Sequence, residues 1–135
     1  MLFAVSHPPD PRPALAVLTT NQVDDAAIQE LKERMLGWGS PNGLLFGRDY
    51  CVILRDTYSS LEADSLQEDG RVETALLLSE VPEGAREFEA RVLEWLQSMA
   101  ASWSRALPSD GKVSAPFIAD IVPAVSGSLV REVAA

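Results

Sequence analysis

Residues 14–18 read Ala-Leu-Ala-Val-Leu, an apolar run with no polar position. A strand of this kind is buried on both faces, which places it in the middle of a sheet. A second apolar run, residues 2–6, precedes it, and residues 8–13 between the two contain four prolines. Prolines supply no ladder donors, so this segment must be a turn or loop. The two runs are therefore predicted to pair as an antiparallel hairpin.

An amphipathic helix is predicted next. Asp24 or Asp25 suits its N-cap, and the glycines and proline within residues 37–41 end it. Its apolar positions recur at helical spacing: Ala27, Ile28, Leu31, Met35 and Leu36. Two further apolar runs, residues 44–46 and 50–55, flank a short turn and predict a second hairpin. A helix between strands is typical of a parallel crossover.

The second half of the chain reads mainly as helical cover for this sheet. Residues 57–70 lack periodicity and are predicted to form a surface loop, with a short helix over residues 72–78. The longest helix is expected over residues 83–107, with one core-facing stripe: Phe88, Val92, Trp95, Leu96, Met99, Trp103 and Leu107. A partner-binding or dimer helix is the alternative interpretation of that stripe.

Two elements are expected near the end of the sequence. Residues 117–125 have helical spacing, with Pro123 bending or restarting the helix. Residues 128–133 predict a short edge strand, because they carry charges. The expected fold is a single α/β (α+β) domain spanning residues 1–135, with a mixed sheet of four to five strands covered by three to four helices.

Charge and cysteine content narrow the function classes. A net charge of −9, from 20 acidic and 11 basic residues, opposes binding to nucleic acid. Cys51 is the only cysteine and lies in an apolar run, so we expect a buried, inert thiol and a cytoplasmic protein. No apolar stretch approaches 18 residues, so no membrane span is predicted.

The acidic residues are unevenly distributed. Residues 56–89 contain ten acidic and two basic side chains. Such a segment is either a solvated face that keeps the protein soluble or a docking surface for a basic partner. Both interpretations stay open at the level of sequence.

The order of these elements resembles PD-(D/E)xK nuclease-fold domains, in particular small proteins similar to the N-terminal domain of type I restriction endonuclease R subunits. The segments that carry the resemblance are Asp10-Pro11-Arg12-Pro13 and residues 14–20, 44–46, 50–56 and 117–133. The resemblance implies a restriction-endonuclease-like fold. It also implies that catalysis would need carboxylates to hold Mg²⁺ and a lysine beside the attacking water.

The catalytic positions implied by this resemblance are vacant. The Glu-x-Lys positions fall on Leu18 and Thr20, which supply neither a carboxylate nor an ammonium, and the upstream Asp falls near Met1. We therefore expect a pseudo-nuclease that is not an enzyme, with no metal and no cofactor. Its expected role is that of a protein-interaction or assembly module.

Three residues are candidates for binding. Arg55 and Asp56 end a predicted strand and form either a site or a structural ion pair. Trp38, between two glycines at a helix end, is expected to be the most exposed of the three tryptophans. The single histidine, His7, offers no relay or multi-histidine metal site and is expected to be exposed among prolines.

The expected partner is a protein, either a second copy in a homodimer or a subunit such as an ATPase, helicase or defence protein. One alternative is a Mg²⁺-dependent DNA nuclease of restriction or defence type, using Asp10, Asp24 or Asp25 together with Asp56. Another is a nucleic-acid sensor that binds without cleaving, which the net charge disfavours.

Overall fold

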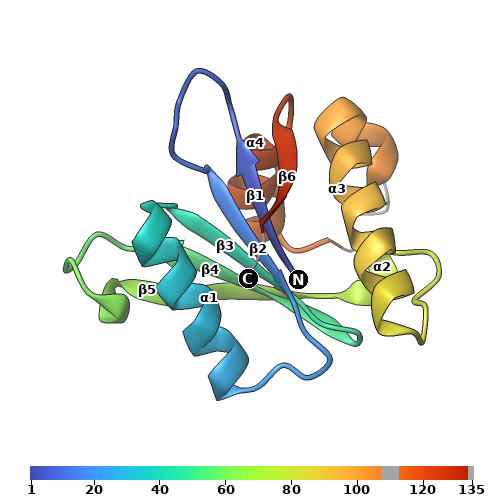
Figure 1. Cartoon of the computed structure of the whole chain (residues 1–135), viewed down its shortest axis with the longest axis horizontal. Coiled ribbons are helices and arrows are strands. Elements are labelled where there is room, and N and C mark those ends of the chain that lie inside the picture. The colour runs from blue at the N-terminus through green and yellow to red at the C-terminus, as the bar shows by residue number, and fades with distance from the viewer. Residues whose placement is uncertain (108–112, 134–135) are drawn as a thin grey trace.

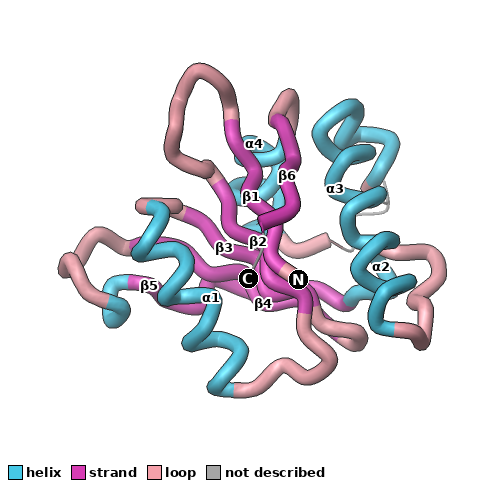
Figure 2. Tube along the Cα trace, in the orientation of Figure 1, coloured by secondary structure: helices cyan, strands magenta, loops and turns pink. Residues whose placement is uncertain are grey.

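The protein is a single α/β domain built around one six-stranded mixed sheet (Figures 1 and 2). The computed structural model describes residues 1–107 and 113–133. In spatial order the strands are β5-β4-β3-β2-β1-β6. Their bounds are β1 (Leu2–Ser6), β2 (Leu15–Thr19), β3 (Asn42–Phe46), β4 (Tyr50–Asp56), β5 (Leu66–Glu73) and β6 (Leu129–Val133).

The helices lie on both faces of the sheet. They are α1 (Asp25–Trp38), α2 (Thr74–Leu77), α3 (Ala85–Ala106) and α4 (Val122–Val125), with a 3-10 turn η1 (Ala63–Ser65) and a π-helical turn η2 (Phe117–Ile121). Helix α1 buries Leu31 and Met35 against one face, together with Leu18, Leu45 and Val52 of the strands. The other face packs against α3, η2 and α4.

The predicted hairpins and crossover are confirmed. Strands β1 and β2 are antiparallel, β2 and β3 are parallel with α1 between them, and β3 and β4 are antiparallel. All five residues of β2 are buried, as expected for a strand inside a sheet. The Asp24 carboxylate accepts a hydrogen bond from Ala27 N (2.8 Å), and Gly39 ends the helix at φ 67°.

The surface loop predicted over residues 57–70 and the helix predicted over 72–78 were wrong in part. Strand β5 occupies Leu66–Glu73, and only the four-residue helix α2 follows it, so the sheet has six strands instead of four to five. β5 is an edge strand with a register irregularity opposite Ile53/Leu54. Its acidic, mostly exposed residues therefore show no two-residue alternation.

The stripe on α3 is confirmed up to Met99, and Trp103 departs from it. Trp103 is 40% exposed, because Ser102 has non-helical backbone angles (φ −162°, ψ 82°) that interrupt the helical period just before it. Leu107 returns to the core at 9% exposure.

The last two predicted elements are present. Residues 117–125 are helical, as a π turn followed by α4 with Pro123 in its first turn. β6 lies at the edge of the sheet beside β1. No helix in the described part of the chain is long and apolar enough to cross a membrane.

Candidate functional site

Three hollows meet at one exposed aromatic side chain, Tyr58, in the loop after β4. The largest, about 510 Å³, lies between the end of α1 and this loop. The two smaller ones, about 260 and 410 Å³, adjoin the segment around Arg12 and the end of β4. Tyr58 lines all three and is 76% exposed.

Two aliphatic side chains extend this apolar area. Leu61, in the same loop, is 98% exposed, and Leu36 of α1 is 39% exposed. Both line the largest hollow together with Met35 and Leu66. We call Leu36, Tyr58, Leu61 and the hollow they line the Tyr58 surface. Exposed apolar side chains gathered around a hollow are characteristic of sites that bind other molecules.

The loop that carries Tyr58 and Leu61 is held by its own hydrogen bonds. The backbone N and the hydroxyl of Thr57 both donate to the carbonyl of Ser65, at 2.8 and 2.7 Å. The Ser65 hydroxyl donates to the carbonyl of Glu62 at 3.0 Å, and the Ser60 hydroxyl bonds to the Asp64 carboxylate. The backbone that carries the two apolar side chains is therefore held in place.

Tyr58 also has an unusual backbone conformation. Its φ is 57°, and it is the one non-glycine residue with positive φ in the part of the chain that the structure describes. An L-residue in this left-handed region is disfavoured by about 1–2 kcal/mol. The Tyr58 N–H donates to the Asp56 carboxylate at 2.8 Å, which helps to hold this conformation. Strain at an exposed aromatic side chain is a reason to look for function there.

Arg55 and Asp56 point to opposite sides of the sheet. Neighbouring side chains alternate along a strand, and Leu54 lies on the α1 side. Asp56 accordingly lines the hollow beside α1, and Arg55 lies on the opposite side, near Asp120 of η2. The structure thus brings Asp56 to the Tyr58 surface, and Arg55 lines the neighbouring hollow of about 410 Å³ together with Asp56 and Tyr58. These two described residues form no ion pair.

Asp120 is a titratable group that sequence patterns did not reveal. The pKa of its carboxyl group is raised from the ordinary 3.8 to about 6. The largest cause is burial, followed by a hydrogen bond with Asp69 of β5 and the charge of that carboxylate, whereas the charge of Arg55 lowers the pKa. Two carboxylates this close do not both ionise readily. The contact joins the π turn to the edge strand, where Gly70 also allows Pro116 to approach closely.

This carboxyl pair predicts a pH-dependent stability. The folded state binds more protons than the unfolded state between about pH 3.8 and about 6, so stability falls as pH rises through this window. Asp120→Asn should therefore raise the free energy of unfolding at pH 7.5, by less than about 1 kcal/mol because the group is partly solvated. The advantage should disappear near pH 4. Urea denaturation at both pH values measures it.

Glu80→Gln, at an exposed position after α2, is the matched control for losing one negative charge. An equal gain at pH 7.5 in Glu80→Gln would assign the effect to net charge instead of the Asp69–Asp120 contact.

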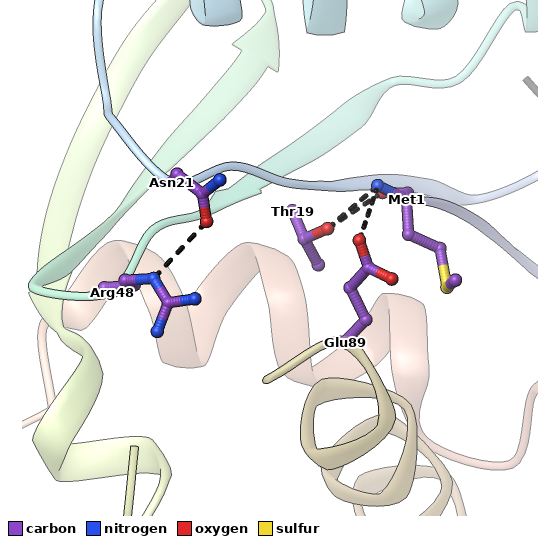
Figure 3. A network of polar contacts seen from close by, with 5 residues as sticks. All are labelled: Met1, Thr19, Asn21, Arg48 and Glu89. Atoms are coloured by element: carbon purple, nitrogen blue, oxygen red, sulfur yellow. Dashed lines mark hydrogen bonds and ion pairs between the residues drawn. The ribbon is translucent and has the colours of Figure 1, made fainter. Parts of the chain in front are cut away.

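The positions where the nuclease resemblance implies the catalytic Glu and Lys have structural roles in this chain. Leu18 is 6% exposed in the α1-side core, and the Thr20 hydroxyl donates to the carbonyl of Gln22 at 2.8 Å. Between them, the Thr19 hydroxyl accepts a hydrogen bond from the Met1 ammonium at 3.0 Å, and this ammonium lies 3.6 Å from Glu89 of α3 (Figure 3). This end of β2 therefore forms structural contacts.

The acids considered for an alternative metal site do not all come together. Asp24 and Asp25 begin α1, whereas Asp56 lies beside residues at the end of that helix. A helix of 14 residues is about 21 Å long, too far for shared ligation. Of these acids, only Asp10 lies in the same region as Asp56: each lines a different hollow that Tyr58 also lines. The described residues contain no group of three or more His, Cys, Asp or Glu positioned to hold a metal ion.

The other candidates have structural environments. Cys51 is fully buried, as expected, and this burial raises the pKa of its thiol from 9.0 to about 12, which disfavours the reactive thiolate. His7 is half-buried and its Nε2 lies 2.7 Å from the carbonyl of Ala124, so the expectation that it is simply exposed was wrong. Trp38 is partly buried against the α1-side core and Trp103 is the most exposed tryptophan, so the expectation that Trp38 is the most exposed was wrong.

Comparison of the chain with protein-family models, curated proteins and solved structures gave no match.

Proposed function

We propose that the protein is a non-catalytic interaction domain that binds a protein partner through the Tyr58 surface. The observation that carries this proposal is the exposure of Tyr58 (76%) and Leu61 (98%) on a hydrogen-bonded loop above a hollow. Ordered, exposed apolar side chains bind with little loss of conformational freedom. Tyrosine is also among the residues that dominate binding energy in protein interfaces.

The charge of the chain favours a basic partner. Asp56 lines the largest of the three hollows at Tyr58, and Glu62 and Asp64 lie in the same loop, within a chain of net charge −9. Opposite charges on two surfaces accelerate association and suppress wrong partners. This is the docking interpretation of the acidic segment, and the partner's surface is expected to be rich in Lys and Arg.

A second copy of the chain fits less well. Two copies would each carry −9 and repel. A symmetric dimer formed by pairing two β6 edges is also disfavoured. In an antiparallel strand pair related by a two-fold axis, the residue at the centre lies opposite its own copy. When the whole of Leu129–Val133 pairs with its copy, the central pair is Arg131 with Arg131, and like charges directly opposite are destabilising.

The nuclease-like ancestry remains a hypothesis within this proposal. It accounts for a mixed α/β sheet whose Glu-x-Lys positions hold Leu18 and Thr20. Under it, a Mg²⁺ titration and a supercoiled-plasmid cleavage assay should both be silent. Specific Mg²⁺ binding with nicking that is lost in Asp10→Ala and Asp56→Ala would establish the nuclease instead.

The interaction itself is tested with a photo-crosslinking amino acid placed at position 58 of the full chain in its native host. Trp103, exposed on α3, is the matched control position. We expect a discrete adduct with a basic protein from position 58 and none of it from position 103. The same adducts from both positions, or no adduct from position 58, would contradict the proposal.

The captured partner is then purified and titrated with two variants. Tyr58→Gly removes the aromatic ring and suits the positive φ, so the fold is retained. We expect it to weaken binding by more than about 1 kcal/mol, or about fivefold or more, as for a central interface tyrosine. Trp103→Ala should bind as the wild type does. Equal affinity for Tyr58→Gly would place the interface elsewhere.

A further inference from the structure

A groove of about 730 Å³ lies between α2 and residues 91–106 of α3. None of its described lining residues belongs to the Tyr58 surface. The two helices that line it, α2 and α3, lie together on one side of the molecule (Figure 1). Small side chains leave the space open, among them Ala75 of α2 and Ser98, Ala101 and Ala106 of α3. Its volume is within the range of sites that hold a small organic molecule.

The groove has an apolar floor. Leu77 is 5% exposed, Trp95 is 2% exposed and Leu107 is 9% exposed. The Trp95 ring is fixed by edge contact with Phe46, at 5.3 Å between centroids, and by Phe117 at 6.0 Å. Such a floor provides favourable burial for the apolar part of a bound molecule.

One buried donor in this floor is unsatisfied. The Trp95 indole N–H is buried and finds no hydrogen-bond partner among the residues that the structure describes. A buried donor without a partner is unfavourable by about 1–3 kcal/mol. Trp95 is one of the residues that line the groove, so a change in what fills the groove is expected to affect this N–H.

The walls of the groove are rich in donors and positive charge. Arg91, Arg105, Ser98 and Ser102 all line it, and Glu94 is its single acidic residue. This is an excess of positive charge in a chain with 20 acidic and 11 basic residues. Arg91 is engaged by Glu94, at 3.9 Å between Nη1 and Oε1, whereas Arg105 forms no ion pair with another described residue. The charge therefore favours an anionic ligand, with Arg105 as its anchor.

We propose that the α2–α3 groove binds a small organic molecule that has an apolar body and a carboxylate group. The guanidinium of Arg105 and the hydroxyl of Ser102, three positions earlier on α3, supply donors for the carboxylate. The apolar body lies over Leu107, Leu77 and Trp95. This site is independent of the protein partner proposed for the Tyr58 surface.

The test uses n-octanoate as the probe, with 1-octanol as the matched neutral molecule, titrated into the full chain by calorimetry. We expect saturable one-to-one binding of octanoate, at a dissociation constant of about 0.1–10 mM for a ligand of this size. Octanol should bind at least about tenfold more weakly, because the charge-assisted hydrogen bonds are absent. Equal binding of both, or no saturable binding, overturns the proposal.

Two variants locate the site. Arg105→Gln should weaken octanoate binding about tenfold, and Arg86→Gln, at an exposed position on α3 outside the groove, should leave it unchanged. Chemical-shift changes of the Trp95 indole N–H on octanoate addition give a second readout, which should be smaller in Arg105→Gln. An equal loss of octanoate affinity in both arginine variants would show that only the overall charge of the protein matters, and would contradict the assigned site.

Discussion

Replacing Phe46 by alanine is expected to lower the free energy of unfolding by about 3–5 kcal/mol. Phe46 is fully buried at the end of β3 and packs edge-on against Phe88, at 6.1 Å between centroids, and Trp95, at 5.3 Å. The loss combines the transfer of a large apolar side chain, a cavity and two aromatic contacts. Because a domain of this size is stable by only about 5–15 kcal/mol, much of its stability depends on this position.

Urea denaturation followed by circular dichroism measures the effect. Phe46→Leu is the matched variant, and it should lose less than about 1.5 kcal/mol because it fills most of the volume. Leu61→Ala, at a side chain that is 98% exposed, should stay within about 0.5 kcal/mol of the wild type. A Phe46→Ala loss no larger than that of Phe46→Leu would show that the aromatic cluster contributes little.

Replacing Thr74 by valine is expected to cost about 1–3 kcal/mol, although the two side chains have nearly the same shape. Thr74 is fully buried, and its hydroxyl donates to the carbonyl of Gly47 at 2.6 Å. The Thr74 backbone N–H also donates to the carbonyl of Asp49, at 3.0 Å. The start of α2 is thus tied to the turn between β3 and β4, and valine leaves the buried Gly47 carbonyl without this donor.

Thr74→Ser is the control, since it keeps the hydroxyl and loses one methyl group. Serine should retain the hydrogen bond to Gly47, which amide exchange in the β3–β4 turn would report. If Thr74→Val is as stable as the wild type, the hydrogen bond makes no net contribution and the turn is held by packing alone.

The first half of the fold could be predicted because local and global signals agree there. The run of residues 14–18 is apolar throughout, and β2 is indeed inside the sheet. Asp24 and Gly39 supply the expected caps of α1. Each of these signals depends only on residues that are close together in the sequence, so the strand and the helix ends can be predicted without knowing the tertiary structure.

β5 escaped prediction because its pairing depends on a distant strand. Leu66 and Val72 are buried, and most residues between them are exposed, acidic or glycine. The ladder with β4 supplies what the local sequence lacks, and the irregularity opposite Ile53/Leu54 removes the period of two. The missed strand also explains why four to five strands were expected where six are present.

The candidate site was predicted less well than the fold. Asp56 was chosen from its place at a strand end, and it does line a hollow. Its neighbour Arg55 lies near Asp120 on the other side of the sheet and lines only one of the smaller hollows, because side chains alternate along β4. Tyr58 and Leu61 had no sequence signal, since their exposure and the positive φ of Tyr58 exist only in the folded loop.

The position of β6 beside β1 has a consequence for the order of folding. Leu2 pairs with Val133 and Ser6 with Leu129, so this ladder joins residues separated by almost the whole length of the chain. Contacts between distant residues form slowly, because a long loop must close before they are gained. During synthesis, one edge of β1 therefore remains without its strand until residues 129–133 have left the ribosome. The apolar first strand is then the segment most open to aggregation or chaperone binding.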